Sequence, residues 1–361
     1  MISVKISPIS NFLCPISLTS NVSNHFKLFI VFVLLLASRT EGADIVRLSE
    51  AGARNPVGTI TEISATEIKI LRANSNTPTV VPAPVISATQ FAQEPPQLTA
   101  MRAAVMGSRF PEVIDTALKL DPATIANPFA RQDYEFFKAF ALSQIALERL
   151  DNKENLQKAI AACTDFLKTQ SGSYHYFPVC ELTGELYQAA GNSENAFQTY
   201  SLLAKAPWSA SQLKANTRLG TIRLDENRLD DAEKYYQAVL ASQDSSADSL
   251  RTKTLAEIGL AKCLLRKGNW KTAIEQLDAL SMKTDAEDAR LQAAIYLTLG
   301  EAHEAAENPK EAILAYLHIE ILFPSAKSEY VAALKQLAIL WNKVNRPERA
   351  AEAEKILKTL E

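Results

Sequence analysis

The residues best suited to chemistry are His303 and Glu304, in the run His303-Glu304-Ala305-Ala306-Glu307. A histidine followed by glutamate is half of a helical zinc site, which needs a second histidine four residues after the first. Position 307 is glutamate, so we expect His303 to pack between helices. Cys163 and His175 could act as nucleophile and base, but Cys163 falls on an apolar helix face with nothing to activate a thiolate. We therefore predict neither a metal site nor a catalytic residue.

Longer motifs typical of enzymes are missing from the sequence. No G-x-S-x-G, G-x-x-x-x-G-K-[ST] or G-x-G-x-x-G pattern occurs, although nucleophile elbows and phosphate-binding turns need these glycines. The 38 basic and 41 acidic side chains give a net charge of −3, which does not suit a phosphate backbone. The sequence predicts no enzyme, no cofactor and no nucleic-acid partner.

Two aromatic-rich turn segments, 173–177 and 206–208, could stack on a flat ligand. They are expected at opposite ends of one helical unit, and we favour the alternative that their rings fill joints between helices. Cysteines give a similarly modest expectation. Cys163 and Cys180 could form a disulfide, but these two and Cys263 are better explained as buried free thiols.

An internal repeat determines the elements that position these residues. Small residues recur at spacings of 36, 41, 39 and 38, namely Gly184, Gly220, Ala261, Gly300 and Ala338. Twelve residues after each stands an alanine, and four positions further stand Tyr200, Tyr236, Leu277, Tyr316 and Glu354. Seven residues after each small residue we expect a turn with φ > 0, at Gly191, Asn227, Gly268, Glu307 and Asn345. The repeat predicts stacked helical hairpins, in which each small residue faces the alanine of the second helix.

The pattern resembles the tetratricopeptide repeat. One unit matches best, through Tyr296, Leu299-Gly300, Ala312, Tyr316 and Pro324. The period is longer than the usual 34, and Arg223, His303 and Trp341 stand where the first clear unit has Tyr187. The resemblance covers roughly residues 98–361 and implies a mainly α fold, a right-handed α-solenoid of five clear and two degenerate units.

In this family, exposed residues of each first helix line a concave groove for a partner peptide or helix. Projecting the repeat onto the sequence gives twelve candidate groove residues: Glu181, Glu185, Gln188, Thr217, Thr221, Lys262, Arg266, Glu301, Glu304, Lys335, Asn342 and Lys343. The alternative for any one of them is an ordinary solvated helix face.

The N-terminal quarter of the chain has a different character. The apolar run Leu28–Ala37 after Lys27 has the length of a signal-peptide core, with a plausible cut after Gly42, although an uncleaved anchor is the alternative. Residues 44–89 alternate with period two and predict four short strands, either a small SH3-like or Sm-like barrel or an irregular meander. A segment this small should pack against the helices or a partner. We predict a signal peptide at 1–42, a β domain and linker at 43–97 and the repeat domain at 98–361.

These observations predict a non-enzymatic scaffold that is exported to the periplasm or cell envelope and binds other proteins on its concave surface. Membrane association would occur only through an uncleaved N-terminal segment. The alternatives are a self-assembling structural subunit of the envelope and an enzyme-associated accessory domain. Glu354, at a position usually aromatic, suggests a polar cap that opposes open-ended stacking.

Overall fold

The computed structural model of the chain describes residues 42–360. Residues 1–41 of the predicted signal peptide, with the apolar run Leu28–Ala37, lie outside these residues, so the signal peptide stays a prediction. Among the described residues, no helix is long and apolar enough to cross a membrane.

Five antiparallel strands come first, ordered β4-β3-β2-β1-β5 in the sheet. Their bounds are β1 (Asp44–Leu48), β2 (Val57–Ile63), β3 (Glu67–Leu71), β4 (Thr79–Pro82) and β5 (Ile86–Gln90). Side chains alternate between buried and half-buried, as in β3, where Ile68 and Ile70 are buried. The four strands predicted from the period of two are therefore confirmed.

Strand β5 is a fifth strand, beyond the four that the sequence predicts. A 3-10 turn at Ala83–Val85 (η1) redirects the chain, and β5 then pairs with β1, with Val46 opposite Thr89. A plain meander pairs only strands that are neighbours in sequence, so the pairing of β5 with β1 departs from the meander alternative. A bulge between Ile60 and Glu62 interrupts the pairing of β2 with β3, and bulges of this kind bend a strand.

The sheet shares its hydrophobic core with the first helices of the chain. Val46 and Ile70 pack in one buried cluster with Leu98, Met101 and Phe137. The expected packing of this small sheet against helices is thus present. Because the core spans both segments, the domain boundary near residue 97 stays a prediction.

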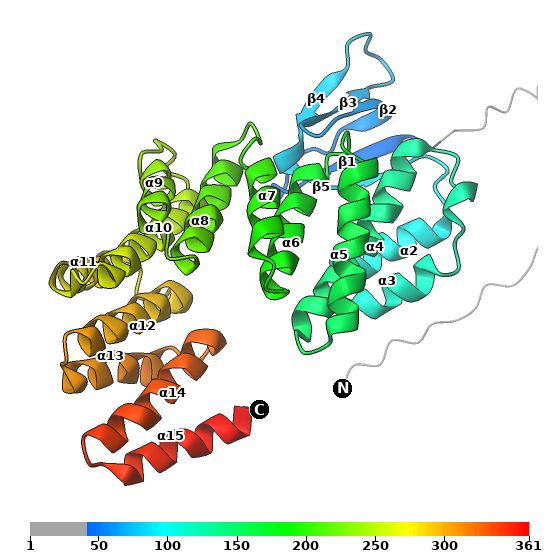
Figure 1. Cartoon of the computed structure of the whole chain (residues 1–361). Coiled ribbons are helices and arrows are strands. Elements are labelled where there is room, and N and C mark those ends of the chain that lie inside the picture. Colours follow the sequence, from blue (N-terminus) through cyan, green and yellow to red (C-terminus); the bar gives the residue numbers. More distant parts are fainter. Residues whose placement is uncertain (1–41, 361) are drawn as a thin grey trace, which may run out of the picture. The chain divides into compact units, whose positions relative to one another are not determined.

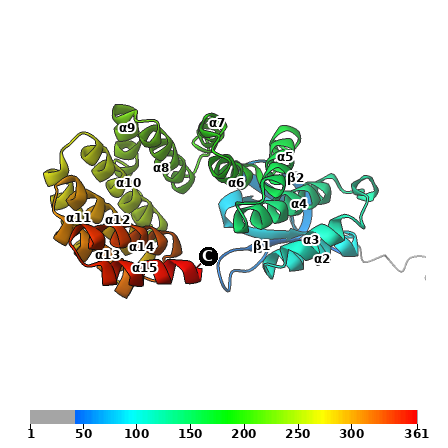
Figure 2. The ribbon, with the colours of Figure 1, turned by 60° about the horizontal axis from the view of Figure 1, so that its bottom comes forward.

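The remainder of the described chain is helical. The helices are α2 (Pro96–Met106), α3 (Phe110–Ala117), α4 (Pro128–Glu148), α5 (Lys153–Thr169), α6 (Tyr176–Ala189), α7 (Ser193–Leu203), α8 (Ser209–Asp225), α9 (Leu229–Leu240), α10 (Ala247–Arg266), α11 (Trp270–Lys283), α12 (Ala289–Ala305), α13 (Pro309–Leu322), α14 (Lys327–Lys343) and α15 (Pro347–Leu360), with a 3-10 turn η2 (Pro122–Thr124). Consecutive helices pair from α2–α3 to α14–α15 (Figures 1 and 2). The first helices of most successive hairpins also pack together, as α8 does on α10 and α10 on α12. The predicted solenoid, with two extra hairpins before the five clear ones, is confirmed.

The turn within each clear hairpin adopts the left-handed backbone that the spacing predicts. The φ angles there are all positive, at Gly191 (71°), Asn227 (60°), Gly268 (79°), Glu307 (59°) and Asn345 (57°). In each case the helix ends one or two residues earlier, so these residues provide the turn after the first helix. All five predicted turn positions are confirmed.

In three hairpins the small residue of the first helix packs against a tyrosine ring of the second helix. A methyl group at Gly184, Gly220 or Gly300 would lie 2.5, 2.8 or 2.3 Å from the ring of Tyr200, Tyr236 or Tyr316, respectively. A ring of the second helix is therefore the nearest neighbour of each of these glycines. The alanines of the second helix are buried as well, and their predicted contact with the small residue stays a prediction. The tyrosine ring of the second helix is larger than the methyl group of an alanine. It can pack against the first helix only where that helix has a glycine, which has no side chain.

Candidate functional site

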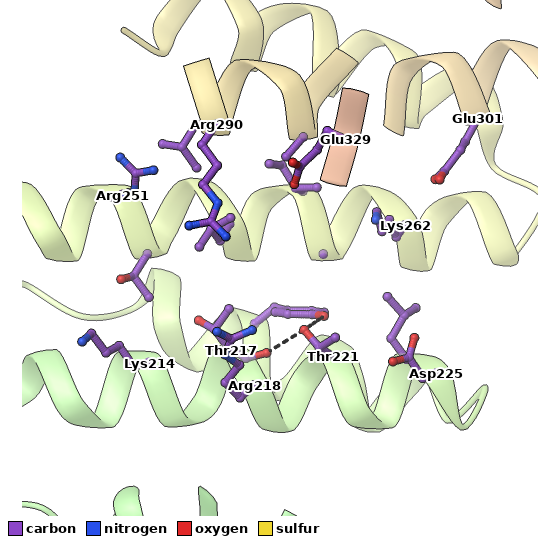
Figure 3. Close-up of a pocket in the computed structure, with 18 of the residues that line it drawn as sticks. Lys214, Thr217, Arg218, Thr221, Asp225, Arg251, Lys262, Arg290, Glu301 and Glu329 are labelled. Atoms are coloured by element: carbon purple, nitrogen blue, oxygen red, sulfur yellow. Dashed lines mark hydrogen bonds between the residues drawn. The ribbon is translucent and has the colours of Figure 1, made fainter. Parts of the chain in front are cut away.

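A cavity of about 760 Å³ lies along the side of the solenoid that the first helices form. Its walls come mainly from α8, α10 and α12, with one residue each from α6, α9 and α14 (Figure 3). Residues recur along α10 at three- and four-residue intervals, from Asp248 through Thr252, Leu255 and Lys262 to Arg266. One continuous face of that helix therefore faces the cavity.

Half of the predicted groove residues line this cavity: Glu181, Thr217, Thr221, Lys262, Arg266 and Glu301. The other half lie outside its lining: Glu185, Gln188, Glu304, Lys335, Asn342 and Lys343. The repeat projection therefore selects six residues that meet in this cavity and six that do not line it.

Three of the projected residues have a packing role that the projection could not reveal. Gln188 accepts a hydrogen bond from the hydroxyl of Tyr200 at 2.8 Å, and Glu304 accepts one from Tyr316 at 2.5 Å. Thr221 shares a hydrogen bond of 3.2 Å with Tyr236. The first helix therefore satisfies the polar end of each buried tyrosine, and these side chains are already engaged.

Other residues of the cavity lie beyond the projected set. Several of them extend the same helix faces toward their N-terminal ends: Lys214, Asp248, Arg251, Leu255 and Arg290. Continuing the three- and four-residue spacing backward from Thr217 and Lys262 would have found most of them. Glu329 of α14 gave no comparable signal, because its position depends on how neighbouring hairpins stack.

The charges of the cavity fall into paired and unpaired groups. Lys214 pairs with Glu181 at 3.3 Å and Arg218 with Glu185 at 3.2 Å, while Arg251 pairs with Asp288. By contrast, neither Lys262 nor Arg290 forms an ion pair with any described residue, and Arg290 reaches from α12 toward α10 (Figure 3). These two cations keep their capacity to bind a carboxylate from outside.

An apolar floor lies between the charged walls. Leu255 is 40% exposed, and the buried side chains of Ile258 and Leu291 lie beside it in the cavity lining. Together these side chains form a small apolar surface with polar residues around it. The cavity thus offers apolar contact and charge to the same ligand.

The sequence candidates for catalysis have other hydrogen-bond partners. The Nε2 of His175 lies 3.1 Å from a carboxylate oxygen of Asp133, and the Sγ of Cys163 lies 3.2 Å from the hydroxyl of Ser143. Burial raises the pKa of the Cys163 thiol, which opposes formation of a nucleophilic thiolate. Cys163, Cys180 and Cys263 are buried free thiols, as predicted.

The two aromatic turn segments meet each other. Phe177 and Trp208 pack edge to face with ring centroids 5.5 Å apart, and Tyr174 and Phe177 are buried. Placing the segments at opposite ends of a unit is therefore wrong, but their role in filling a joint between helices is confirmed. His303 is half-buried in the last turn of α12.

Comparison with known proteins identifies the fold. The sequence matches no protein-family model, and no curated protein matches it in sequence. The structure is similar to that of a tetratricopeptide repeat protein from Parabacteroides merdae, with a TM-score of 0.54 and 15% identity, over 73% of this chain and 91% of that one. It is also similar to a Rap protein complexed with Competence and Sporulation Factor, with a TM-score of 0.50 and 12% identity, over 72% of this chain and 74% of the other.

Proposed function

We propose that this chain, whose fold is that of a tetratricopeptide-repeat protein, is a non-enzymatic scaffold whose concave cavity binds a segment of another protein. The observation that carries the proposal is the cavity itself, in which an apolar floor at Leu255 lies beside the unpaired cations Lys262 and Arg290. A partner segment with an apolar side chain flanked by carboxylates would match both features. A Rap protein of similar fold, solved with Competence and Sporulation Factor, is in keeping with this role.

We further propose that the protein acts in the cell envelope after its N-terminal segment is removed. Gly42 and Ala43 are exposed, whereas Asp44 is buried and its carboxylate accepts hydrogen bonds of 2.7 Å from the backbone of Ile60 and Ala92. Cleavage after Gly42 would therefore leave every described contact of the sheet intact. The mass of the protein recovered from the envelope fraction of its own cells tests this, because a chain that still starts at Met1 would contradict cleavage.

The binding proposal is tested by site-specific photocrosslinking in the native host. A photoreactive amino acid at position 255, in the cavity, should capture a defined protein that the same group at exposed Leu314, outside the cavity, does not capture. The double variant Lys262→Glu and Arg290→Glu should weaken capture about tenfold, the effect of roughly 1.4 kcal/mol in binding.

The matched control reverses two exposed lysines of second helices, Lys271→Glu and Lys310→Glu. This control keeps the same change of net charge outside the cavity and should leave capture unchanged. Equal capture from positions 255 and 314, or equal weakening by both double variants, would contradict binding in the cavity.

Self-assembly is the competing role. The last helix, α15, exposes Glu352, Glu354, Lys355 and Lys358 at the end of the solenoid, and charged ends oppose stacking of one array on another. We expect a monomer by light scattering over a wide concentration range. Growth of the particle with concentration would favour the structural subunit instead.

A further inference from the structure

A second cavity, of about 350 Å³, lies on a different face of α10, where α9, α10 and α11 meet. We call it the α11 cleft, and it is lined by Leu240, Glu257, Leu260, Ala261, Gln276, Leu277, Ala279, Leu280 and Lys283. The side chains of Ala261, Leu277 and Leu280 are buried and form its floor. None of its residues lines the concave cavity, so the two sites are separate.

The repeat explains why a cleft exists in this hairpin. Every clear hairpin has three positions that correspond to Glu257, Gln276 and Ala279. The first lies four residues before the small residue of the first helix. The other two lie three and six residues after the alanine of the second helix. In the other four clear hairpins the three positions hold Cys180, Thr199 and Leu202; Asn216, Tyr235 and Ala238; Tyr296, Ala315 and His318; and Leu334, Ala353 and Ile356. Each of those sets contains at least one large apolar or aromatic side chain. The set in α10 and α11 contains none.

The neighbouring hairpins show which kind of side chain fills this place. In the following hairpin, Tyr296 stacks on His318 with ring centroids 4.5 Å apart and planes 10° from parallel. In the preceding hairpin, Tyr235 packs edge to face on Phe197 at 6.2 Å. On both sides of the cleft the equivalent space is therefore occupied by an aromatic ring.

The rim of the cleft suits an aromatic ring that has a polar end. Lys283 donates a hydrogen bond of 3.0 Å to Glu257, across the mouth of the cleft, and Gln276 is exposed beside them. A phenol hydroxyl can donate to the Glu257 carboxylate or accept from the Lys283 ammonium group. The apolar floor would cover the ring while the rim binds its hydroxyl.

We propose that the α11 cleft binds a tyrosine side chain of a partner protein, which supplies the ring that the chain itself lacks in this hairpin. The inference does not depend on binding in the concave cavity, because it rests on different residues. A partner that used both sites would contact two faces of the same helix, α10.

The test uses the full-length protein and three capped tripeptides, acetyl-Gly-Tyr-Gly-amide and its counterparts with leucine or alanine in the centre. We expect the tyrosine peptide to shift the methyl NMR signals of Leu277 and Leu280 saturably, at least tenfold more tightly than the other two. The variant Glu257→Tyr with Ala279→His rebuilds the stacked pair of the next hairpin and should abolish the shifts. Gln276→Tyr, which imitates Tyr235, serves as a second filled variant should the first fail to fold.

Lys262→Ala, which changes only the concave cavity, is the matched control and should leave the shifts unchanged. The proposal is overturned if the tyrosine peptide causes no saturable shift, if the leucine peptide binds equally well, or if both filled variants bind as the parent does. Binding of free p-cresol without binding of the tyrosine peptide would also overturn it, because the cleft would then accept a small molecule and not a partner's side chain.

Discussion

The ring of Tyr236 packs directly on the backbone of Gly259, which belongs to the following hairpin: a methyl group at position 259 would lie 2.3 Å from the ring. On its other side, the same ring packs on Gly220 of its own hairpin. One side chain on α9 therefore connects the first helices of two successive hairpins, α8 and α10. Close approach of the helices depends on the absence of a side chain at both glycines.

Gly220→Leu should destabilise the protein, because a side chain at 220 would collide with the Tyr236 ring. Overpacking of a closed interface typically costs about 1–3 kcal/mol. Chemical denaturation measures the change. Lys262→Ala is the control, since a half-exposed lysine without an ion pair should change the free energy of unfolding by no more than about 0.5 kcal/mol.

The natural pair Ala261 and Leu277 indicates how the clash can be relieved. Gly220→Ala and Tyr236→Leu reproduce that pair in the preceding hairpin, and we expect their combined cost to be smaller than the sum of the separate costs. Strict additivity, or a Gly220→Leu variant as stable as the parent, would contradict the packing of Gly220 on Tyr236.

The repeat could be predicted from the sequence because it depends on local requirements. A left-handed turn must recur at a fixed distance from the small residue, and Gly191, Asn227, Gly268, Glu307 and Asn345 all satisfy it. Spacing also places residues on one face of a helix, but it does not say how far a side chain reaches. For that reason the spacing did not reveal that a tyrosine ring packs on Gly184, Gly220 and Gly300, or that Gln188 and Glu304 accept hydrogen bonds from two of those tyrosines.

Contacts between distant segments were not predictable in the same way. Asp133 of α4 lies against Thr89 of β5 and His175 of the turn before α6, at 2.6 and 3.1 Å. No periodicity relates these positions, because the sheet and two hairpins must fold before they meet. Strand β5 was missed for a related reason, since the pairing that stabilises it is with β1, some 40 residues earlier.

Glu307→Gly should stabilise the protein. Glu307 adopts a φ of 59°, which costs a residue with a Cβ about 1–2 kcal/mol relative to its right-handed conformation, and glycine avoids most of this strain. We expect thermal unfolding to give a gain of about 0.5–1 kcal/mol. Glu275→Gly, on the exposed face of α11, is the matched control and should lose about that amount. A loss in both variants would contradict relief of strain at 307.

Arg102→Met should be strongly destabilising. Arg102 of α2 donates two hydrogen bonds, of 2.6 and 2.8 Å, to Glu94, and its guanidinium lies 3.9 Å from Asp133. All three side chains are nearly inaccessible to solvent, so removing the cation leaves two buried carboxylates uncompensated. Breaking such a pair costs about 3–5 kcal/mol.

Arg109→Met is the matched control, because Arg109 forms an ion pair of 2.8 Å with Glu112 in which both side chains are more than half exposed. Exposed pairs contribute about 0–1 kcal/mol. If Arg102→Met and Arg109→Met lose the same free energy of unfolding in urea, burial does not make the contribution of Arg102 larger than that of an exposed arginine.

His175 should make the stability depend on pH between about 5 and 7. Burial lowers the pKa of His175, and the contact with Asp133 offsets this only in part. The unfolded chain, with a histidine pKa of about 6.5, therefore takes up a proton at a higher pH than the folded chain does. Stability should be unaffected by His175 above about pH 6.5 and should fall as the pH drops below it, by up to about 1.4 kcal/mol per pH unit.

The quantity to compare is the slope of the unfolding free energy against pH, in the parent and in His175→Gln. The substitution also removes the stacking of the ring on Phe136, at 3.6 Å. That loss lowers stability by the same amount at every pH, so it does not change the slope. Glu94 acts at lower pH: burial alone would raise its pKa, but hydrogen bonds from Arg102 and Thr99 lower it, so its contribution is lost only as the pH falls below about 4.5. A parent whose unfolding free energy falls no more steeply than that of His175→Gln between pH 7 and 5 would contradict a buried neutral imidazole at this position.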